Sequence, residues 1–460
     1  MQQNITKIQK TKKMKNEPLP LTFRTREVKS VFSCLMAGNS CQIVGIGSVG
    51  KSNLLRFLLR EDMRKAKLGA GWKNYLFIYV DGNKLLENSE WGLWELMLHQ
   101  ILAGTSGFKL TPAIYRKIDE FHRRAIIPDE RQIALRYLDR AIGKALTSPE
   151  SKIVFLLDEF DELYRTLPAH ALDALRALRD DYKYRLMYVI ATRRELHQIR
   201  SANDHREALD ELVTSNTIWL SIYSKADARD ALLRLASRYK IKPSEKQIQA
   251  VLMAIGGHPG LIRAVFPAIM EDSSRLPESL YTEKSVHQEC ERIWLSLSKD
   301  EQKKLALLAG NKSFSNSTGI LDLLINKGLL WGEWVESGKI FSPLFSEYIN
   351  KTRPVEEARI RIDRRKRQVW MDEYPLKSLS PLEYQLLEYL ESRRGQVCSR
   401  EQIVQYLYPN VKISGVSRNA IDSIVKRLRK RIEANHKKPE FIVTVHGVGF
   451  RLIDGEDEMT

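Results

Sequence analysis

The sequence has few cysteines and no long apolar run. Its four cysteines are spread through 460 residues without C-x-x-C spacing or a nearby histidine pattern (Cys34, Cys41, Cys290 and Cys398). This spacing argues against a zinc site or a disulfide framework, and we expect reduced thiols that lie mostly in the core. No apolar stretch reaches the roughly 20 residues that a membrane span needs, and no apolar signal region follows the basic segment 1–18. We therefore expect a cytoplasmic protein with a disordered amino-terminal arm and no membrane partner.

Acidic residues are also in the minority. The sequence has 74 Lys and Arg against 57 Asp and Glu, a formal net charge of +17, which favours a polyanionic partner such as nucleic acid. The excess is concentrated near the carboxyl end, because the segment 411–451 carries ten basic residues and three acidic ones. A chain of this length is expected to form roughly three or four compact units.

The clearest motif lies in the segment 41–59. A short apolar strand precedes a G-x-x-x-x-G-K-S loop, and a helix with apolar leucines follows the loop. This is the spacing of a phosphate-binding loop, whose backbone N–H groups and helix N-terminus face phosphate. Lys51 is predicted to reach the terminal phosphates, and Ser52 is predicted to hold Mg²⁺. The predicted nucleotide-binding residues of the loop are Gly45, Gly47, Gly50, Lys51, Ser52 and Asn53.

A second apolar strand, 153–157, ends in two carboxylates. Parallel sheets bind their ligands at the carboxyl ends of the strands. Asp158 is therefore predicted to orient Mg²⁺, and Glu159 is predicted to position or deprotonate the attacking water. The alternative is an acidic helix cap that follows a buried strand. The next two acidic residues, Asp161 and Glu162, are expected to be solvated helix residues.

Two further apolar runs extend a predicted parallel sheet. They cover residues 75–80 and 186–191, and polar residues follow each of them. Thr192 is predicted to sense the γ-phosphate of the nucleotide. Arg193 is predicted to stabilise phosphate charge, with an ordinary surface arginine at a strand end as the alternative.

Residues 1–350 resemble the STAND branch of AAA-related P-loop ATPases, which are signal-responsive switches. The segment 23–27 matches the family's F-x-G-R-E motif except that threonine replaces glycine, and the match implies that Arg26 helps to form the adenine pocket. The segment 191–193 resembles the family's T-x-R or T-T-R sensor. The segment 256–260 resembles the lid motif G-x-P and implies that Pro259 packs near adenine. The resemblance implies ATP or ADP and Mg²⁺ as cofactors, and a slow hydrolysis of ATP to ADP and phosphate.

The segments after the ATPase domain are expected to be largely helical. Helices rich in alanine and leucine predict a lid over 223–283, and the pattern over 284–352 predicts a first winged-helix domain. Relatives often use a histidine in that module to hold the β-phosphate of ADP, but none occurs between His287 and His436. We expect His258 to lie on the lid surface, with a substitute phosphate clamp as the alternative.

A charged junction, 359–367, separates the preceding segments from a carboxyl-terminal segment with a different pattern of helices and strands. Two short helices begin at Ser380 and Ser399, each with Glu or Gln three residues later, which is the spacing of a capping box. A basic amphipathic helix, 417–433, and a hairpin around the segment 446–449 follow. One face of the basic helix is apolar, and the opposite face carries Asn419, Ser423, Lys426, Arg427 and Lys430.

Residues 360–455 resemble the OmpR/PhoB-type winged-helix output domain. A basic helix of this shape fits the major groove of double-stranded DNA, and the wing reaches the neighbouring backbone or minor groove. The alternative for the helix alone is a solvated charged face. The loop 406–417 matches the segment that touches RNA polymerase in relatives, with an ordinary connector as the alternative. The resemblance adds Arg429 and two wing residues to the helix face, so the predicted DNA-binding residues are Asn419, Ser423, Lys426, Arg427, Arg429, Lys430, Thr444 and His446.

The predicted fold is multidomain α/β plus α. It comprises a P-loop parallel-sheet ATPase over 19–222, the helical lid, the first winged helix, and a C-terminal winged helix-turn-helix over 353–457. We hypothesise a signal-responsive transcription regulator whose nucleotide state gates DNA binding or homo-oligomerisation, with an unknown ligand or protein as the signal. One alternative is a DNA-dependent ATPase of mobile-element, replication-initiator or phage-defence type. Another is a P-loop that binds nucleotide only structurally.

Overall fold

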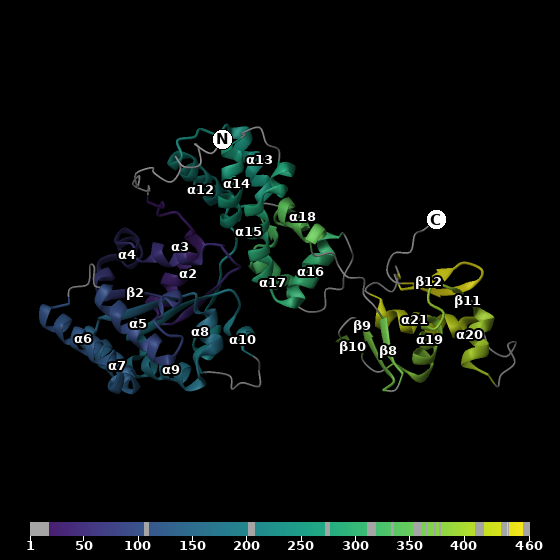
Figure 1. Cartoon of the computed structure of the whole chain (residues 1–460), viewed down its shortest axis with the longest axis horizontal. Helices are drawn as coiled ribbons and strands as arrows, with labels where there is room; N and C mark the ends of the chain where they lie inside the picture. Colours follow the sequence, from purple (N-terminus) through teal and green to yellow (C-terminus); the bar gives the residue numbers. More distant parts are fainter. Residues whose placement is uncertain are drawn as a thin grey trace. The chain divides into compact units, whose positions relative to one another are not determined.

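A computed structural model defines the fold of the chain (Figure 1). Two compact units compose it, Met1–Gln302 with Ile320–Tyr348 and Lys303–Gly319 with Ile349–Thr460. Residues 1–17 of the predicted arm, 1–18, and residues 410–417 of the loop matched to a polymerase contact lie outside the described residues. The structure describes residues 18–104, 110–200, 208–271, 277–310, 319–332, 335–352, 360–364, 366–371, 374–376, 379–409, 418–433, 439 and 441–453.

A five-stranded parallel sheet forms the centre of the first unit, with the order β2-β3-β4-β1-β5. Successive residues of β1, β3 and β4 are buried. Because successive side chains of a strand point to opposite faces, both faces of these strands are covered. Since β4 lies between β1 and β3, its last residue lies between the phosphate loop and Asp158. The strands are β1 (Cys41–Val44), β2 (Tyr75–Asp81), β3 (Lys152–Asp158), β4 (Leu186–Thr192) and β5 (Thr217–Trp219).

Helices cover the sheet, and three of them (α5, α6 and α7) pack against one another beside β2. Apolar residues at helical spacing explain the packing, since the buried side of α7 carries Tyr137, Leu138, Ala141, Ile142 and Ala145. The α-helices of this region are α2 (Thr25–Met36), α3 (Lys51–Leu58), α4 (Glu61–Leu68), α5 (Glu90–Ala103), α6 (Pro112–Ala125), α7 (Ala134–Ala145), α8 (Phe160–Thr166), α9 (Ala169–Tyr182), α10 (Leu196–Ile199) and α11 (Ala208–Thr214).

The segment after β5 is mainly helical, as the sequence predicts for the lid. Serine side chains cap α12 and α13, and Ser244 forms a full capping box with Gln247. A short hairpin of β6 and β7 follows further along the chain. The elements are α12 (Lys225–Arg238), α13 (Glu245–Ile255), α14 (Pro259–Glu271), α15 (Lys284–Leu295), α16 (Lys299–Ala309), α17 (Ile320–Asn326), β6 (Leu330–Gly332), β7 (Val335–Ile340) and α18 (Pro343–Thr352).

The second unit contains the predicted C-terminal winged helix. Both predicted capping boxes form, at Ser380 with Glu383 and at Ser399 with Gln402. The sequence predicted only a charged junction before this domain. In the structure Ile360 of that junction packs in the core, and the first strand of a three-stranded antiparallel sheet, with the order β10-β9-β8, begins at this residue. A second sheet, β11-β13-β12, carries the wing. The elements are β8 (Ile360–Asp363), β9 (Gln368–Met371), β10 (Tyr374–Pro375), α19 (Pro381–Glu391), β11 (Val397–Ser399), α20 (Arg400–Leu407), α21 (Arg418–Ile432), β12 (Ile442–Val445) and β13 (Gly449–Leu452).

The predicted fold class is confirmed in its main parts. A parallel sheet carries the phosphate loop, helices follow it, and a winged helix ends the described chain. Cys41, Cys290 and Cys398 are buried and Cys34 is half-buried, as expected for core thiols. Among the described residues, no helix has both the length and the apolar character to cross a bilayer.

Candidate nucleotide and DNA-binding sites

The phosphate loop connects β1 to α3, which begins at Lys51. Its backbone includes Ser48 with φ 55° and Gly50 with φ 103°, both in the left-handed region that side chains disfavour. A Cβ on Gly45 would lie 2.8 Å from a methyl carbon of Val49, so this position accepts glycine alone without rearrangement. The strained backbone therefore lies at the predicted nucleotide site, where such conformations concentrate in proteins.

The side chain of Lys51 is folded back into its own loop. Its Nζ donates to the carbonyl oxygens of Gly45 (2.7 Å) and Ile46 (3.2 Å). Burial lowers the pKa of this ammonium to about 8, although nearby carboxylates oppose the shift. Ser52 and Asn53 lie half-buried in the first turn of α3. The loop thus gathers a cation, a hydroxyl and an amide at one helix N-terminus.

Asp158 and Glu159 lie where the sequence predicts, at the end of β3. Asp158 is buried, and its Oδ2 accepts a hydrogen bond from the Tyr79 hydroxyl at 2.5 Å. Glu159 has φ 52°, a strained conformation for this residue type, and its Oε2 lies 3.4 Å from Nη2 of Arg193. Burial and the bond to Asp158 raise the pKa of Tyr79. Tyr79 was not predicted as a site residue, because it is an interior residue of an apolar strand.

The turn after β4 is fixed by local hydrogen bonds. Thr192 is buried, and its hydroxyl donates to the carbonyl oxygen of Arg194 at 2.6 Å. The backbone N–H of Arg193 donates to Oδ1 of Asp161 at 2.8 Å, while the Arg193 side chain is half exposed. The prediction of a solvated residue was therefore wrong for Asp161, whose carboxylate anchors this turn to α8. Glu162 is exposed, as expected.

Two arginines at the start of the described chain differ sharply in placement. The predicted Arg26 is exposed on α2. Arg24 is buried, donates to Val49 O (3.0 Å) and Ser221 O (2.5 Å), and lies 4.6 Å from the centre of the Tyr223 ring. Burial lowers the pKa of the Arg24 guanidinium. Arg24 is thus the arginine that reaches the phosphate loop, whereas the sequence motif pointed to Arg26.

The lid contacts the loop through His258, which is fully buried. The expectation of a lid-surface histidine was therefore wrong. Its Nδ1 accepts the backbone N–H of Leu261 (3.2 Å), and its Nε2 lies 3.0 Å from the carbonyl oxygen of Gly47. Since a carbonyl oxygen only accepts, Nε2 carries the hydrogen and the ring is neutral. Pro259 is buried next to it as the first residue of α14.

Helix α15 also covers the loop, a contact that the sequence did not predict. A Cβ on Gly47 would lie 2.8 Å from the carbonyl oxygen of Arg292. A Cβ on Gly260 would lie 1.9 Å from Oε1 of Glu289 and 2.9 Å from Cβ of Ser48. Glu289 is buried, and that Oε1 has no hydrogen-bond partner. The phosphate loop is therefore closed over by the lid and by α15.

In the second unit, α21 has the two faces predicted from its sequence. The side chains that pack into the core are Ile421, Ile424, Val425, Leu428 and Ile432. The predicted DNA-binding residues on the opposite face are exposed, and they are Asn419, Ser423, Lys426, Arg427 and Lys430. At the wing tip His446 is exposed and Thr444 is half-buried.

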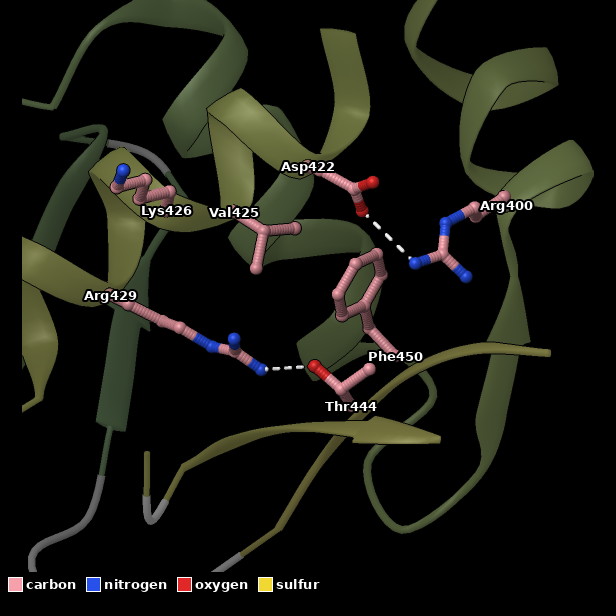
Figure 2. A pocket seen from close by; sticks show the side chains of 7 residues that line it. All are labelled: Arg400, Asp422, Val425, Lys426, Arg429, Thr444 and Phe450. Atoms are coloured by element: carbon pink, nitrogen blue, oxygen red, sulfur yellow. Dashed lines mark hydrogen bonds and ion pairs between the residues drawn. The ribbon is translucent and has the colours of Figure 1, made fainter. Parts of the chain in front are cut away.

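Arg429 differs from these cations because it is bonded to the wing. It donates through Nε to Ile442 O (2.9 Å) and through Nη2 to Thr444 Oγ1 (2.8 Å). Figure 2 shows its side chain extending from α21 toward Thr444. Burial lowers the pKa of its guanidinium. Arg429 therefore joins the basic helix to the wing.

A pocket of about 480 Å³ lies between α21 and the wing. Figure 2 shows Arg400 pointing into it from the start of α20, where it pairs with Asp422 at 3.1 Å. Lys426 of α21 also lines it. Arg427 lies outside the pocket, with Nε 3.4 Å from Oε1 of Glu383. Helix, wing and pocket together form one strongly cationic surface.

Residues 376–452 match the family described as "Transcriptional regulatory protein, C terminal". This segment is an OmpR/PhoB-type winged-helix domain. The OmpR/PhoB-type domain is 40% identical over 73 residues to the transcriptional regulatory protein BaeR of Escherichia coli O6:H1, which is 16% of this chain and 30% of that protein. It is 31% identical over 106 residues to a probable transcriptional regulator, ycf27, of Guillardia theta, which is 23% of this chain and 41% of that protein. The chain thus covers less than half of either relative.

Solved structures are similar to each part of the chain. The RstA DNA-binding domain of Klebsiella pneumoniae, in complex with the RstA box, is 26% identical and matches 22% of this chain and 95% of that chain, with a TM-score of 0.20. A Walker-type ATPase of Pyrococcus abyssi is 15% identical over 73% of this chain and 100% of that chain, with a TM-score of 0.47. The ADP form of the Aeropyrum pernix ORC2 protein is 15% identical over 76% of this chain and 90% of that chain, with a TM-score of 0.43.

Proposed function

We propose that this chain is a transcription regulator in which nucleotide at the phosphate loop controls DNA binding by the OmpR/PhoB-type domain. The observation that carries the proposal is the closure of the phosphate loop by His258 and by the backbone of Arg292. A loop that the lid and α15 cover in one arrangement must change those contacts when phosphate occupies it. Nucleotide binding is thereby coupled to movement.

The chemistry of the loop suits ATP with Mg²⁺. Phosphate oxygens would replace the carbonyl oxygens of Gly45 and Ile46 as acceptors for Lys51, and they would interact more strongly with its charge. Ser52 and Asp158 would hold Mg²⁺, which supplies charge neutralisation for the phosphates. Glu159 would position the attacking water, and Arg193 would stabilise the developing charge.

The coupling follows from differential affinity. A ligand shifts an equilibrium between two arrangements only by as much as it binds one of them better. In the described arrangement Oε2 of Glu289 pairs with Nη1 of Arg292 at 2.9 Å, while its buried Oε1 lies beside the loop without a hydrogen-bond partner. A triphosphate would be repelled by that unpaired oxygen. ATP is therefore expected to favour an arrangement in which α15 leaves the loop.

The cationic surface of the second unit suits double-stranded DNA. Asn419, Ser423 and Lys426 occupy the exposed face of a helix that fits the major groove. Arg427 and Lys430 extend the same face, and arginine pairs with guanine edges while lysine suits phosphate. Arg429, which bonds to the wing, is assigned to fixing the angle between helix and wing.

The test is selection and sequencing of random DNA bound by the full-length protein, with ATP and Mg²⁺ in one arm and ADP in the other. A single repeated motif, enriched much more in one nucleotide state, is the expected result. Lys51→Ala should recover the motif equally in both arms. Recovery of DNA without any motif, together with hydrolysis that DNA strongly stimulates, would instead indicate a DNA-dependent ATPase.

A further inference from the structure

Two histidines and a glutamate meet between α5 and α6, away from both sites described above. Glu95 and His99 are one helical turn apart on α5, so their side chains share one face of that helix. His122 lies in the last turn of α6. The two helices pack against each other beside β2 in the first unit (Figure 1).

The three side chains point their ligand atoms at one another. His122 Nε2 lies 2.8 Å from Oε1 of Glu95, and the His99 and His122 ring centres are 5.4 Å apart. One ligand atom from each residue lies within 4.8 Å of the other two. In a tetrahedral zinc site with bonds near 2.1 Å, neighbouring ligand atoms are about 3.4 Å apart. Small rotations of the side chains would therefore close the set around an ion.

We propose that Glu95, His99 and His122 bind a divalent transition-metal ion of the zinc class. Two imidazole nitrogens and one carboxylate oxygen are a donor set that suits zinc, nickel or copper and does not suit Mg²⁺ or Ca²⁺, which prefer oxygen. Three protein ligands leave a position for water or an exogenous ligand. The cysteine pattern that argued against zinc does not bear on this site, because none of its ligands is a cysteine.

Burial distinguishes this cluster from an ordinary surface ion pair. Glu95 is 6% exposed, whereas the nearby pair of His170 and Glu90 is exposed on both sides, at 70% and 44%. A buried carboxylate is costly unless positive charge is close to it. A bound ion would supply that charge, and His99, which is exposed, leaves a path for the ion from solvent.

Zinc would tie α6 to α5, and α5 packs on β2. β2 carries Tyr79, whose hydroxyl bonds to Asp158. The proposed metal site is thus connected to the predicted nucleotide site through β2. Because the ion would bind the folded chain and not the unfolded one, it should raise the melting temperature by roughly 5 °C at a free zinc concentration about 100 times the Kd.

The experiment is calorimetric titration of chelator-treated, nucleotide-free full-length protein with Zn²⁺, in a buffer with excess Mg²⁺. We expect one zinc site that His99→Ala and His122→Ala each weaken by about 100-fold or more. His170→Ala, the matched control, should leave the titration unchanged. Saturable binding that both ligand variants retain, or no binding by the wild-type protein, would overturn the proposal.

A second measurement guards against variants that misfold. Co²⁺ in place of Zn²⁺ should give visible absorption bands typical of a four-coordinate nitrogen and oxygen site. Glu95→Gln keeps the size of the side chain and should lose these bands while its circular dichroism stays that of the wild-type protein. Unchanged bands in Glu95→Gln would exclude Glu95 as a ligand.

Discussion

The imidazole of His258 donates a hydrogen bond to the carbonyl oxygen of Gly47, with 3.0 Å between Nε2 and oxygen. One bond therefore ties the residue that precedes α14 in the predicted lid to the centre of the phosphate loop. The Nδ1 of the same ring accepts the N–H of Leu261, and so both ring nitrogens are used only when the ring is neutral. Protonation would remove an acceptor and place a charge in a fully buried site.

Lowering the pH should weaken this hydrogen bond and reduce the stability of the fold. Burial lowers the pKa of His258 from 6.5 to about 3. Below about pH 6.5 the ring binds a proton in the unfolded chain but not in the fold, so proton uptake favours unfolding. The stabilisation is present above 6.5 and is lost as pH falls toward 3. The free energy of unfolding should decrease by up to about 1.4 kcal/mol per pH unit from this group.

The control for this prediction is His258→Gln, whose amide can donate to Gly47 but does not titrate. Denaturant unfolding of both proteins would be followed from about pH 7.5 to about pH 5, a range that spans the unfolded pKa. The wild-type protein should lose more stability than the variant over this range. Equal losses would mean that another group is responsible.

Lys51→Ala should abolish nucleotide binding. The buried ammonium is the cation of the loop, and loss of its charge-assisted contacts should weaken ATP binding by at least about 100-fold. Titration with a fluorescent ATP analogue measures this effect. Lys65→Ala, which removes an exposed surface ion pair on α4, should bind as the wild-type protein does. Unchanged affinity of Lys51→Ala would rule out this loop as the nucleotide site.

Glu159→Gln should separate hydrolysis from binding. If Glu159 activates the attacking water, phosphate release should fall by about 10²–10⁴-fold while ATP affinity is kept. The matched control is Glu162→Gln, three residues along the chain and exposed. A variant that releases phosphate at the wild-type rate would remove Glu159 from the mechanism.

Arg427→Ala should mainly weaken DNA binding, whereas Arg429→Ala should mainly destabilise the winged helix. Arg427 is exposed, although its Nε lies 3.4 Å from Oε1 of Glu383, and its loss should cost about 1–3 kcal/mol at the preferred DNA site if it reads a base. Arg429 bonds to Ile442 and Thr444, and its loss should destabilise the winged helix by about 1.5–3 kcal/mol. Fluorescence anisotropy with labelled DNA and thermal unfolding distinguish the two. Weaker DNA binding by Arg427→Ala at every sequence alike would make it a phosphate contact.

Local patterns in the sequence predicted much of this fold. The G-x-x-x-x-G-K-S spacing, the apolar strand before Asp158, and the serines that cap α19 and α20 each depend on residues close together in the chain. The exposed cationic face of α21 also follows from its period of 3.6 residues. Such features are set by backbone geometry and by local hydrogen bonds, and the sequence by itself determined them.

The tertiary structure alone decided which side chains meet. Arg24 and not Arg26 reaches Val49, and Tyr79 bonds to Asp158 from a neighbouring strand. His258 reaches back 211 positions to the phosphate loop, and its burial reverses the placement expected from sequence. These contacts join segments that are far apart in the chain and are fixed by strand order and helix packing. No local periodicity encodes that arrangement, and so the closure of the phosphate loop became visible only in the folded chain.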